Sequence, residues 1–450
     1  MSLRSARPLL LLLAFALAVA AGGVLSSPRQ ARPQAPPPTP DVRGDIIASG
    51  ARKVTIAIPD FTLVGGSDPQ VLVKRVPEVL GNDLNFSAVF TVLAGAPALP
   101  ANNPGALKEA WAGFAAAGAH AALHGLLSNR GDRAEVEMRL YDLTSPEQRL
   151  IFSKKFEMPV AQARRLSHKL ADEVVLQYTG ELGIADTKIA YTGAAGGIKE
   201  VYLMDYDGVG MVRMTTTQSI NLSPVWSPDA RSIAFTSYMN GYPFLYRLFA
   251  FEKRQIQLLA GYGGINSSPA FSPDGKSVAL TLSKDGNPEV YVLNLSTGAL
   301  RRLTSNAAID TEPSWSPTGR EIAFISDRAG PAQVFVMDAE GTNVRRLTQG
   351  GFNTQPRWSP KGDAIVYTSR QGNHDLWAVS PDGSNPRRLT AGPGSNEGAS
   401  WAPNGRHLVF QSSRLGSFQL FTMLGDGSEQ QLLTKGPGEI TSGAWSPRLP

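Results

Sequence analysis

The chain has 450 residues, no cysteine and a formal net charge of +5 at pH 7, which is enough length for two or more domains. The lack of cysteine excludes disulfides, cysteine-ligated zinc and thiol catalysis. Residues 1–40 contain four arginines and no acidic residue, which leaves +1 for the rest of the chain. We therefore expect no nucleic-acid partner, because a surface that follows phosphates needs clustered excess cations.

The first 40 residues have the composition of an export signal and a linker. Residues 1–26 combine a basic start, an apolar run at Leu9–Leu17 and an A-x-A site at Ala18–Ala20, which predicts a cleavable signal peptide. An uncleaved membrane anchor is the alternative. Residues 27–40 contain repeated prolines and predict an extended linker. No other apolar run approaches the roughly 20 residues of a membrane helix, so we expect no transmembrane segment in the mature chain.

Residues 41–182 predict an α/β sandwich domain of one sheet and two or three helices. Apolar residues alternate where strands are expected and recur at helical spacing elsewhere. Asp68 is a candidate cap for the first helix. The predicted strands are Val54–Ile58, Val89–Leu93, Ala121–Leu127, Glu135–Leu143 and Leu150–Phe156, and the predicted helices are Asp68–Leu84, Pro104–Ala117 and Val160–Leu182.

Residues 183–450 contain a repeat whose third copy reads PSWSPTGREIAFIS from Pro313. Its aromatic anchor recurs at Trp226, Phe271, Trp315, Trp358, Trp401 and Trp445, at spacings of 45, 44, 43, 43 and 44 residues. Strand-forming repeats of this period are typical of a β-propeller. The third copy predicts four strands, at 314–316, 321–325, 333–338 and 344–348, which make one blade.

The two ends of the repeat region predict how the ring closes. Strands at Lys188–Thr192, Val201–Asp205 and Met211–Thr215 lack a preceding anchor strand, whereas Gly443–Pro447 is an anchor strand with nothing after it. The simplest arrangement is a six-bladed propeller in which the C-terminal strand completes blade one and removes the exposed sheet edges.

The loops that join successive blades are the candidate binding site. They read QSINLS (218–223), GINSS (264–268), NAAIDTE (306–312), GGFNTQ (350–355) and GPGSNE (392–397). Each leads into an inner strand, so together they ring the mouth of the central channel, and such a concave polar ring suits a protruding protein segment. The alternative is that these loops are polar only because they are exposed. The candidate residues are Asn221, Ser223, Asn266, Ser268, Thr311, Glu312, Thr354, Gln355, Asn396 and Glu397.

Enzyme and metal sites have weaker support. No G-x-S-x-G nucleophile motif is present, which argues against a peptidase of the α/β-hydrolase type. A secreted hydrolase or lyase that acts on glycans through Glu312 and Glu397 stays open as an alternative. Asp205–Gly208 lacks the further acids of a calcium loop and predicts a turn. His120 and His124 have zinc-like spacing but no third ligand. We expect no catalytic residue, metal or cofactor.

The domain order and the repeats, which end in AWSP at Ala444–Pro447, resemble the TolB family of periplasmic propeller proteins in the Tol–Pal system. The resemblance covers residues 41–447 and implies a monomeric, non-enzymatic protein that supports outer-membrane integrity and cell division. It also implies that the channel loop with Thr311 and Glu312 receives a Pal-like peptidoglycan-associated lipoprotein. The segment DIIASGARKVTIAIPDF (45–61) resembles the family stretch that contacts a TolA-like inner-membrane protein. The residues implied in that contact are Asp45, Ile46, Ile47, Ser49 and Gly50.

Overall fold

The computed structural model describes residues 52–68, 70–100, 103–252, 255–436 and 438–450. The predicted signal peptide, the linker and the implied TolA-contact residues Asp45, Ile46, Ile47, Ser49 and Gly50 lie outside the described residues. Within the described part of the chain, none of the helices combines the length and apolar character needed to cross a membrane.

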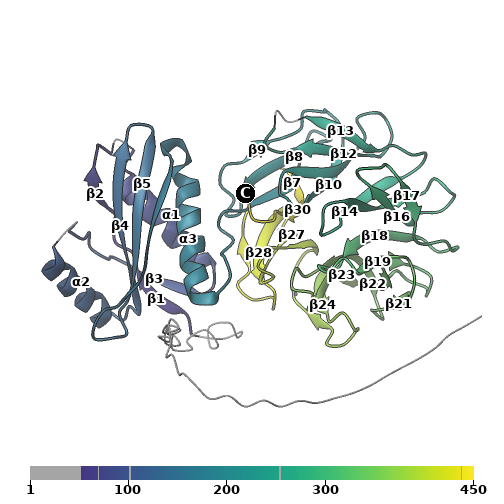
Figure 1. The fold of residues 1–450 in the computed structure, drawn as a ribbon. Coiled ribbons are helices and arrows are strands. Elements are labelled where there is room, and N and C mark those ends of the chain that lie inside the picture. Colours follow the sequence, from purple (N-terminus) through teal and green to yellow (C-terminus); the bar gives the residue numbers. More distant parts are fainter. Residues whose placement is uncertain (1–51, 69, 101–102, 253–254, 437) are drawn as a thin grey trace, which may run out of the picture. The chain divides into compact units, whose positions relative to one another are not determined.

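The N-terminal domain is built on one six-stranded mixed sheet (Figure 1). Its order is β3-β1-β4-β5-β6, and β2 also pairs with β4. Strands β1, β2 and β3 run parallel to their neighbours, whereas β4, β5 and β6 form antiparallel hairpins. The bounds are β1 Val54–Ala57, β2 Thr62–Gly65, β3 Phe90–Leu93, β4 Ala121–Arg130, β5 Arg133–Asp142 and β6 Leu150–Pro159. The predicted sandwich is confirmed, with β2 as an additional strand.

Helices cover both faces of this sheet. Helices α1 (Leu72–Phe86) and α3 (Ala163–Thr179) share one apolar cluster with the sheet, and α2 (Pro104–Ala116) shares a second. The N-cap residue of α1 is Val71 and not the predicted Asp68, because the helix starts later than predicted. The Asp68 carboxylate still accepts the backbone N–H groups of Leu72 and Val73 at 2.8 and 2.9 Å and so satisfies the first two donors of the helix. Helix α3 follows a short 3-10 turn and ends before Gly180, whose φ of 76° stops it short of the predicted Leu182.

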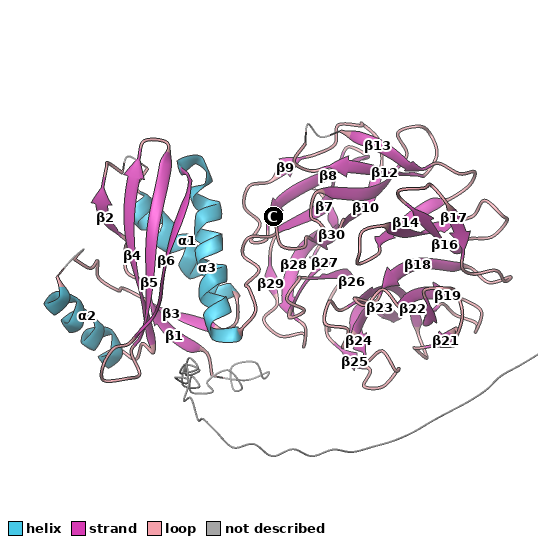
Figure 2. Cartoon of the chain, in the orientation of Figure 1, coloured by secondary structure: helices cyan, strands magenta, loops and turns pink. Residues whose placement is uncertain are grey.

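The rest of the described chain folds into six four-stranded antiparallel sheets arranged around a centre (Figure 2). We number these blades by closure: blade one is β30-β7-β8-β9, and blades two to six are β10–β13, β14–β17, β18–β21, β22–β25 and β26–β29. The inner strands are β10 Asn221–Trp226, β14 Asn266–Phe271, β18 Asp310–Trp315, β22 Phe352–Trp358, β26 Asn396–Trp401 and β30 Ile440–Trp445. The second strands are β7 Lys188–Ala195, β11 Ser232–Ser237, β15 Ser277–Leu282, β19 Glu321–Ser326, β23 Ile365–Gln371 and β27 His407–Leu415. The third are β8 Ile198–Asp205, β12 Phe244–Phe249, β16 Glu289–Asn294, β20 Gln333–Asp338, β24 Asn373–Val379 and β28 Ser417–Leu424. The outer strands are β9 Val212–Arg213, β13 Ile256–Ala260, β17 Leu300–Arg302, β21 Arg345–Arg346, β25 Arg387–Arg388 and β29 Gln431–Leu432.

The predicted closure is confirmed. C-terminal strand β30 pairs antiparallel with β7, with Trp445 opposite Ile189. The six-bladed propeller is therefore completed by segments more than 240 residues apart in sequence, roughly the length of a whole propeller. Within blade four, the inner strand begins at Asp310 instead of the predicted 314, and the outer strand is only Arg345–Arg346.

The repeated anchor residues connect neighbouring blades. The indole N–H of Trp226 donates to the Ala444 carbonyl at 3.2 Å, and that of Trp315 donates to the Ala270 carbonyl at 3.1 Å. The indole N–H of Trp401 donates to the backbone carbonyl of Arg357 at 3.2 Å. Each of these three bonds runs from one inner strand to the inner strand before it, so these three indoles tie neighbouring blades together.

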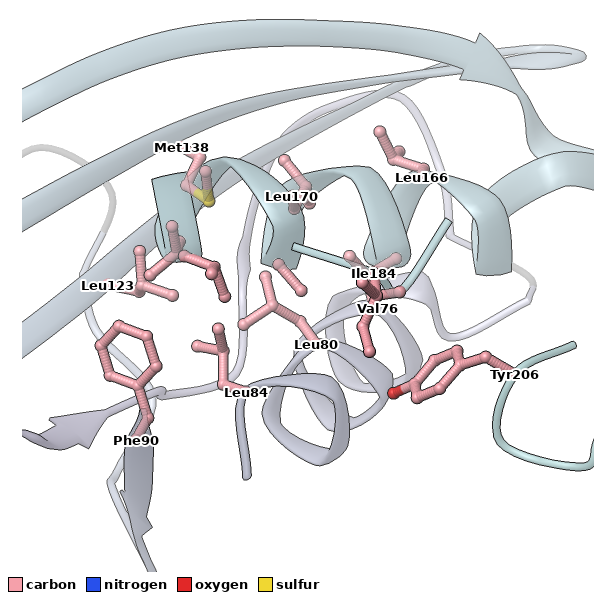
Figure 3. Close-up of a cluster of buried hydrophobic side chains, with 14 of the residues drawn as sticks. Val76, Leu80, Leu84, Phe90, Leu123, Met138, Leu166, Leu170, Ile184 and Tyr206 are labelled. Carbon is pink, nitrogen blue, oxygen red and sulfur yellow. The ribbon is translucent and has the colours of Figure 1, made fainter. Parts of the chain in front are cut away.

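Apolar and polar contacts join the N-terminal domain to the propeller. Tyr206 of the β8–β9 turn packs into the same cluster as the residues of α1 and α3 (Figure 3). Phe86, at the end of α1, stacks on His407, and its carbonyl accepts the His407 Nε2–H at 3.0 Å. Ion pairs from Lys361 to Glu181 and from Lys53 to Glu429 extend the interface. All of these propeller residues lie at or beside the turns that follow the first or third strand of a blade. The N-terminal domain therefore contacts the end of the propeller where those turns lie.

Candidate functional site

Every inner strand carries the same distortion at the same position. In all six blades, one residue of the inner strand has a positive backbone φ, between 50° and 62°. It lies where the pairing between the inner and second strands shifts in register. The residues are Ser223, Ser268, Glu312, Gln355, Gly398 and Ser442. A β-bulge of this kind re-aims side chains and is frequent next to binding sites. Five of the six are not glycine, so the surrounding fold must stabilise this backbone conformation.

The backbone N–H groups of these bulge residues bind the preceding blade. Glu312 N–H donates to Thr281 Oγ1 at 3.2 Å, and Gly398 N–H donates to Thr368 Oγ1 at 3.2 Å. Gln355 N–H donates to Glu312 Oε2 at 2.6 Å. Ser442 N–H donates to the Gln411 side-chain oxygen at 2.8 Å. Four of the six bulges are therefore hydrogen-bonded to the preceding blade, which fixes the shape of that part of the channel wall.

A cavity of about 480 Å³ lies along these inner strands. Its wall includes the aromatic anchors and the prolines that follow them, together with the bulge residues Ser223, Gln355, Gly398 and Ser442. The volume is within the range of small-ligand sites. The wall contains one charged side chain, that of Arg357.

Three of the ten candidate residues are fully buried. Asn221, Asn266 and Asn396 begin their inner strands with no exposed surface. Each side chain is held within the fold: Asn221 donates to the Lys199 carbonyl at 2.8 Å, Asn266 to the Tyr262 carbonyl at 2.8 Å and Asn396 to Asp375 Oδ1 at 3.0 Å. These amides hold the blade-to-blade loops in place and are not presented at the surface.

The other seven candidates lie together on the inner strands. Ser223, Ser268, Glu312 and Gln355 are bulge residues, and Thr311, Thr354 and Glu397 directly precede bulge residues. All seven are partly exposed. Glu397 Oε1 lies 3.3 Å from His374 Nδ1.

Glu312 already has a structural role, since Oε2 binds the backbone of the next blade. Burial raises the pKa of Glu312, whereas the Gln355 N–H and the nearby Arg357 act to lower it. Burial likewise lowers the pKa of Arg357, and Glu312 opposes that effect. Oε1 has no hydrogen-bond partner among the described residues, so the carboxylate can still accept one bond from a ligand.

The sequence analysis did not identify a group of exposed apolar residues at the start of the inner strands, which we call the collar. Ile220, Ile265, Ile309 and Phe352 directly precede the first buried polar residue of four consecutive inner strands. They are 39, 43, 48 and 40% exposed, respectively. Their spacing of 45, 44 and 43 residues follows the repeat, and this period could have identified them. A recurrent exposed apolar residue needs an explanation that scattered surface residues do not.

Ile220, Ile265 and Ile309 directly precede their inner strands, and Phe352 is the first residue of β22. All four therefore lie where the inner strands begin, at the end of the channel away from the turns that follow first and third strands. The N-terminal domain contacts turns at the opposite end, as in the Lys361–Glu181 pair. In an antiparallel four-stranded blade, these two sets of connections lie at opposite ends of the strands. We call this end of the channel, with the collar and the bulge residues next to it, the mouth.

Comparisons with known proteins agree across both domains. A model of the TolB beta propeller domain matches residues 176–449, and a model of the TolB amino-terminal domain matches residues 43–149. The Tol-Pal system protein TolB of Gluconobacter oxydans is 37% identical over 402 residues, which cover 87% of this chain and 85% of that protein.

Two further similar proteins match over different shares of their length. The Tol-Pal system protein TolB of Geobacter sulfurreducens is 39% identical over 199 residues, so the match spans 43% of this chain and less than half (44%) of that relative's length. The crystal structure of TolB from Acinetobacter baumannii is 28% identical, with a TM-score of 0.75, and the match covers 88% of this chain and 97% of that one.

Proposed function

Because the chain belongs to the TolB family of Tol-Pal system proteins, we propose that it is a non-enzymatic periplasmic adaptor whose propeller mouth binds a Pal-like peptidoglycan-associated lipoprotein. Its role would be to support outer-membrane integrity and cell division. The observation that carries the site is the collar: four partly exposed apolar side chains surround a ring of partly exposed polar groups. Exposed apolar side chains that gather at one place on a surface and become buried on docking are typical anchors of a protein-binding site.

The collar supplies affinity, and the bulge residues supply selectivity. Full burial of a large apolar side chain contributes about 1.5–3 kcal/mol. Ser223, Ser268, Glu312 and Gln355 present hydroxyl, carboxylate and carboxamide groups just below the collar. Because the backbones of Glu312 and Gln355 are hydrogen-bonded to the preceding blade, these two groups are held in place before the partner arrives, which limits the entropy lost on binding.

Calorimetric titration with the non-lipidated Pal-like protein tests this site. We expect Ile265→Ser combined with Ile309→Ser to raise the dissociation constant more than tenfold, because two anchors are lost. The matched control is Leu258→Ser, which removes an apolar side chain that is 58% exposed on β13, outside the mouth. Equal weakening by the control and the collar variant would contradict the assignment. Turnover of peptidoglycan or another glycan by the purified protein, lost in Glu312→Gln, would instead support the hydrolase or lyase alternative.

The second partner in this proposal is a TolA-like inner-membrane protein. It would bind the N-terminal segment with Asp45, Ile46, Ile47, Ser49 and Gly50, which the structure does not describe. Support comes from the family membership and from the match of the amino-terminal domain model, which begins at residue 43. Deletion of residues 43–50 should abolish binding to the TolA-like protein and leave the affinity for the Pal-like protein within about twofold if the two sites are independent. If the deletion variant still binds both proteins, this segment is not the binding site for the TolA-like protein.

A further inference from the structure

One blade differs from the other five at a single position of the channel wall. The residue two positions after each bulge lines the cavity, and in five blades it is small or aliphatic. Blade five carries Arg357 there. The six residues in order are Val225, Ala270, Ser314, Arg357, Ser400 and Ala444.

The Arg357 guanidinium lacks an ion-pair partner among the described residues. Its one hydrogen bond is short-range, from Nη1 to the Pro356 carbonyl at 2.8 Å. Other partly buried arginines of the propeller bind carboxylates directly, as Arg328 binds Asp310 at 2.8 Å and Arg388 binds Asp375 at 2.6 Å. Glu312 is near enough to affect the pKa of Arg357 but does not form an ion pair with it. The remaining guanidinium donors are therefore available to a ligand.

Two glutamine side chains add donors to the same part of the cavity. The Gln355 side-chain oxygen accepts the Thr368 hydroxyl at 2.8 Å, and that of Gln411 accepts the Ser442 N–H at 2.8 Å. These bonds fix the orientation of both amides and leave their Nε2 groups without an acceptor within the described part of the chain. Both side chains approach the open position at Gly398, where an added Cβ would lie 3.8 Å from Gln355 Nε2 and 3.7 Å from Gln411 Oε1.

We propose that the channel is a carboxylate-binding site in which Arg357 receives the anion and the Gln355 and Gln411 amides assist it. A guanidinium withdrawn from bulk water is stabilised by an oxyanion that accepts two parallel hydrogen bonds. The wall contains one cation, and the Glu312 carboxylate is near enough to interact with it, so the site matches a monoanion better than a phosphate dianion. Indole and proline rings make up much of the remaining wall, so the carboxylate belongs to a molecule with apolar surface.

Two sources can supply this chemistry: a free organic acid, or an acidic side chain of a polypeptide segment inserted through the mouth. The site does not depend on the proposed Pal-like partner, because its residues belong to this chain alone. The probes are N-acetyl-glutamic acid amide, its neutral analogue N-acetyl-glutamine amide, and a short peptide with one glutamate. Binding to the full chain is followed through the indole N–H signals in nitrogen–proton NMR spectra.

We expect both acidic probes to shift the signals of channel tryptophans in a saturable way and the neutral analogue to bind at least tenfold more weakly. Loss of a hydrogen bond to a charged group typically costs about 1.5–3 kcal/mol, so Arg357→Gln should weaken the acid by roughly 10- to 150-fold. Arg357→Lys should retain part of the affinity. The control is Arg231→Gln, which changes an exposed arginine in the turn between β10 and β11.

The two possible ligands give different results. Binding of the free acid supports a small-molecule ligand, and binding of only the peptide supports an inserted segment. Equal affinity for acid and neutral analogue, an unchanged affinity in folded Arg357→Gln, or no saturable binding of any probe would overturn the proposal. If Arg357→Gln does not fold, the comparison of the acid with its neutral analogue on the unaltered protein still decides. A failure of the Pal-like protein to bind would leave this result untouched.

Discussion

The Tyr206 hydroxyl donates a hydrogen bond to Asp83 Oδ1 at 2.6 Å and so joins blade one to helix α1. The other oxygen of the same carboxylate lies 2.8 Å from His168 Nδ1 on α3. All three side chains are buried. One carboxylate on α1 therefore contacts both the propeller and helix α3, and loss of either partner leaves a buried acceptor underbonded.

Tyr206→Phe should destabilise the protein although it removes a single oxygen atom. Asp83 would keep only its His168 contact, and an underbonded buried acceptor typically costs about 1–3 kcal/mol. We expect denaturant unfolding to show a lower midpoint and, if the domains separate first, a second transition. Tyr242→Phe is the control, because Tyr242 is 66% exposed. Superimposable unfolding curves for wild type and Tyr206→Phe would show that the bond does not hold the interface.

The same cluster should make stability depend on pH. Burial alone would lower the pKa of His168, but the Asp205 carboxylate, 3.9 Å from Nε2, and the Asp83 carboxylate, 2.8 Å from Nδ1, outweigh burial and raise the pKa to about 9. A histidine whose pKa is higher when folded stabilises the fold fully below its unfolded value of about 6.5. That contribution is lost as pH rises through about 9.

The measurement is the free energy of unfolding at pH 6 and pH 10 for wild type and His168→Gln. Taking the difference between the two proteins removes the titration of residues that they share. We expect wild type to lose on the order of 3 kcal/mol more than the variant over this interval. Parallel pH profiles for the two proteins would show that His168 carries no such linkage.

The repeat made the blades and their closure predictable, because the spacing of the aromatic anchors and the unpaired C-terminal strand depend on sequence alone. The bulges were not predictable by propensity. Ser268 and Glu312 adopt a positive φ that local preferences disfavour, and only the contacts between blades stabilise it. The distortion is visible in sequence only as a polar residue before proline, and only in the four blades with Ser223, Ser268, Glu312 and Gln355.

The candidate site could be predicted only in part, because the polarity of a residue does not decide whether its side chain is exposed. Asn266 is polar and lies in a loop, which suggests exposure, but its amide satisfies the loop backbone and the side chain is buried. Ile265 beside it is apolar, which suggests burial, but it is 43% exposed. Tyr206 was interpreted only as part of a turn, because the residue that binds it, Asp83, lies 123 positions earlier. Polarity alone cannot assign these positions; the partner of each side chain must be known.

Deletion of Gly443–Pro450 should have an effect far beyond its length. The deletion removes Ala444 and Trp445, which form two of the four residue pairs between β30 and β7, and with them the Trp445 indole bond to Thr187 Oγ1 at 2.9 Å. Blade one would retain three strands and an open edge, and blades are stabilised mainly by their neighbours. We expect insoluble protein or a thermal midpoint lower by many degrees. Deletion of only Leu449–Pro450 should be tolerated far better, and equal midpoints for the longer deletion and wild type would refute closure by this strand.

Glu312 combines a structural and a binding role, and two variants separate them. Glu312→Ala leaves the Gln355 N–H without its 2.6 Å acceptor, so it should lower the free energy of unfolding by about 1–3 kcal/mol. Glu312→Gln keeps an acceptor of similar shape and should cost less. Both remove the negative charge, and since loss of one member of a buried charged contact costs about 2–5 kcal/mol, both should weaken the Pal-like partner more than tenfold. Wild-type affinity in Glu312→Gln, measured by calorimetric titration, would leave Glu312 with the structural role alone.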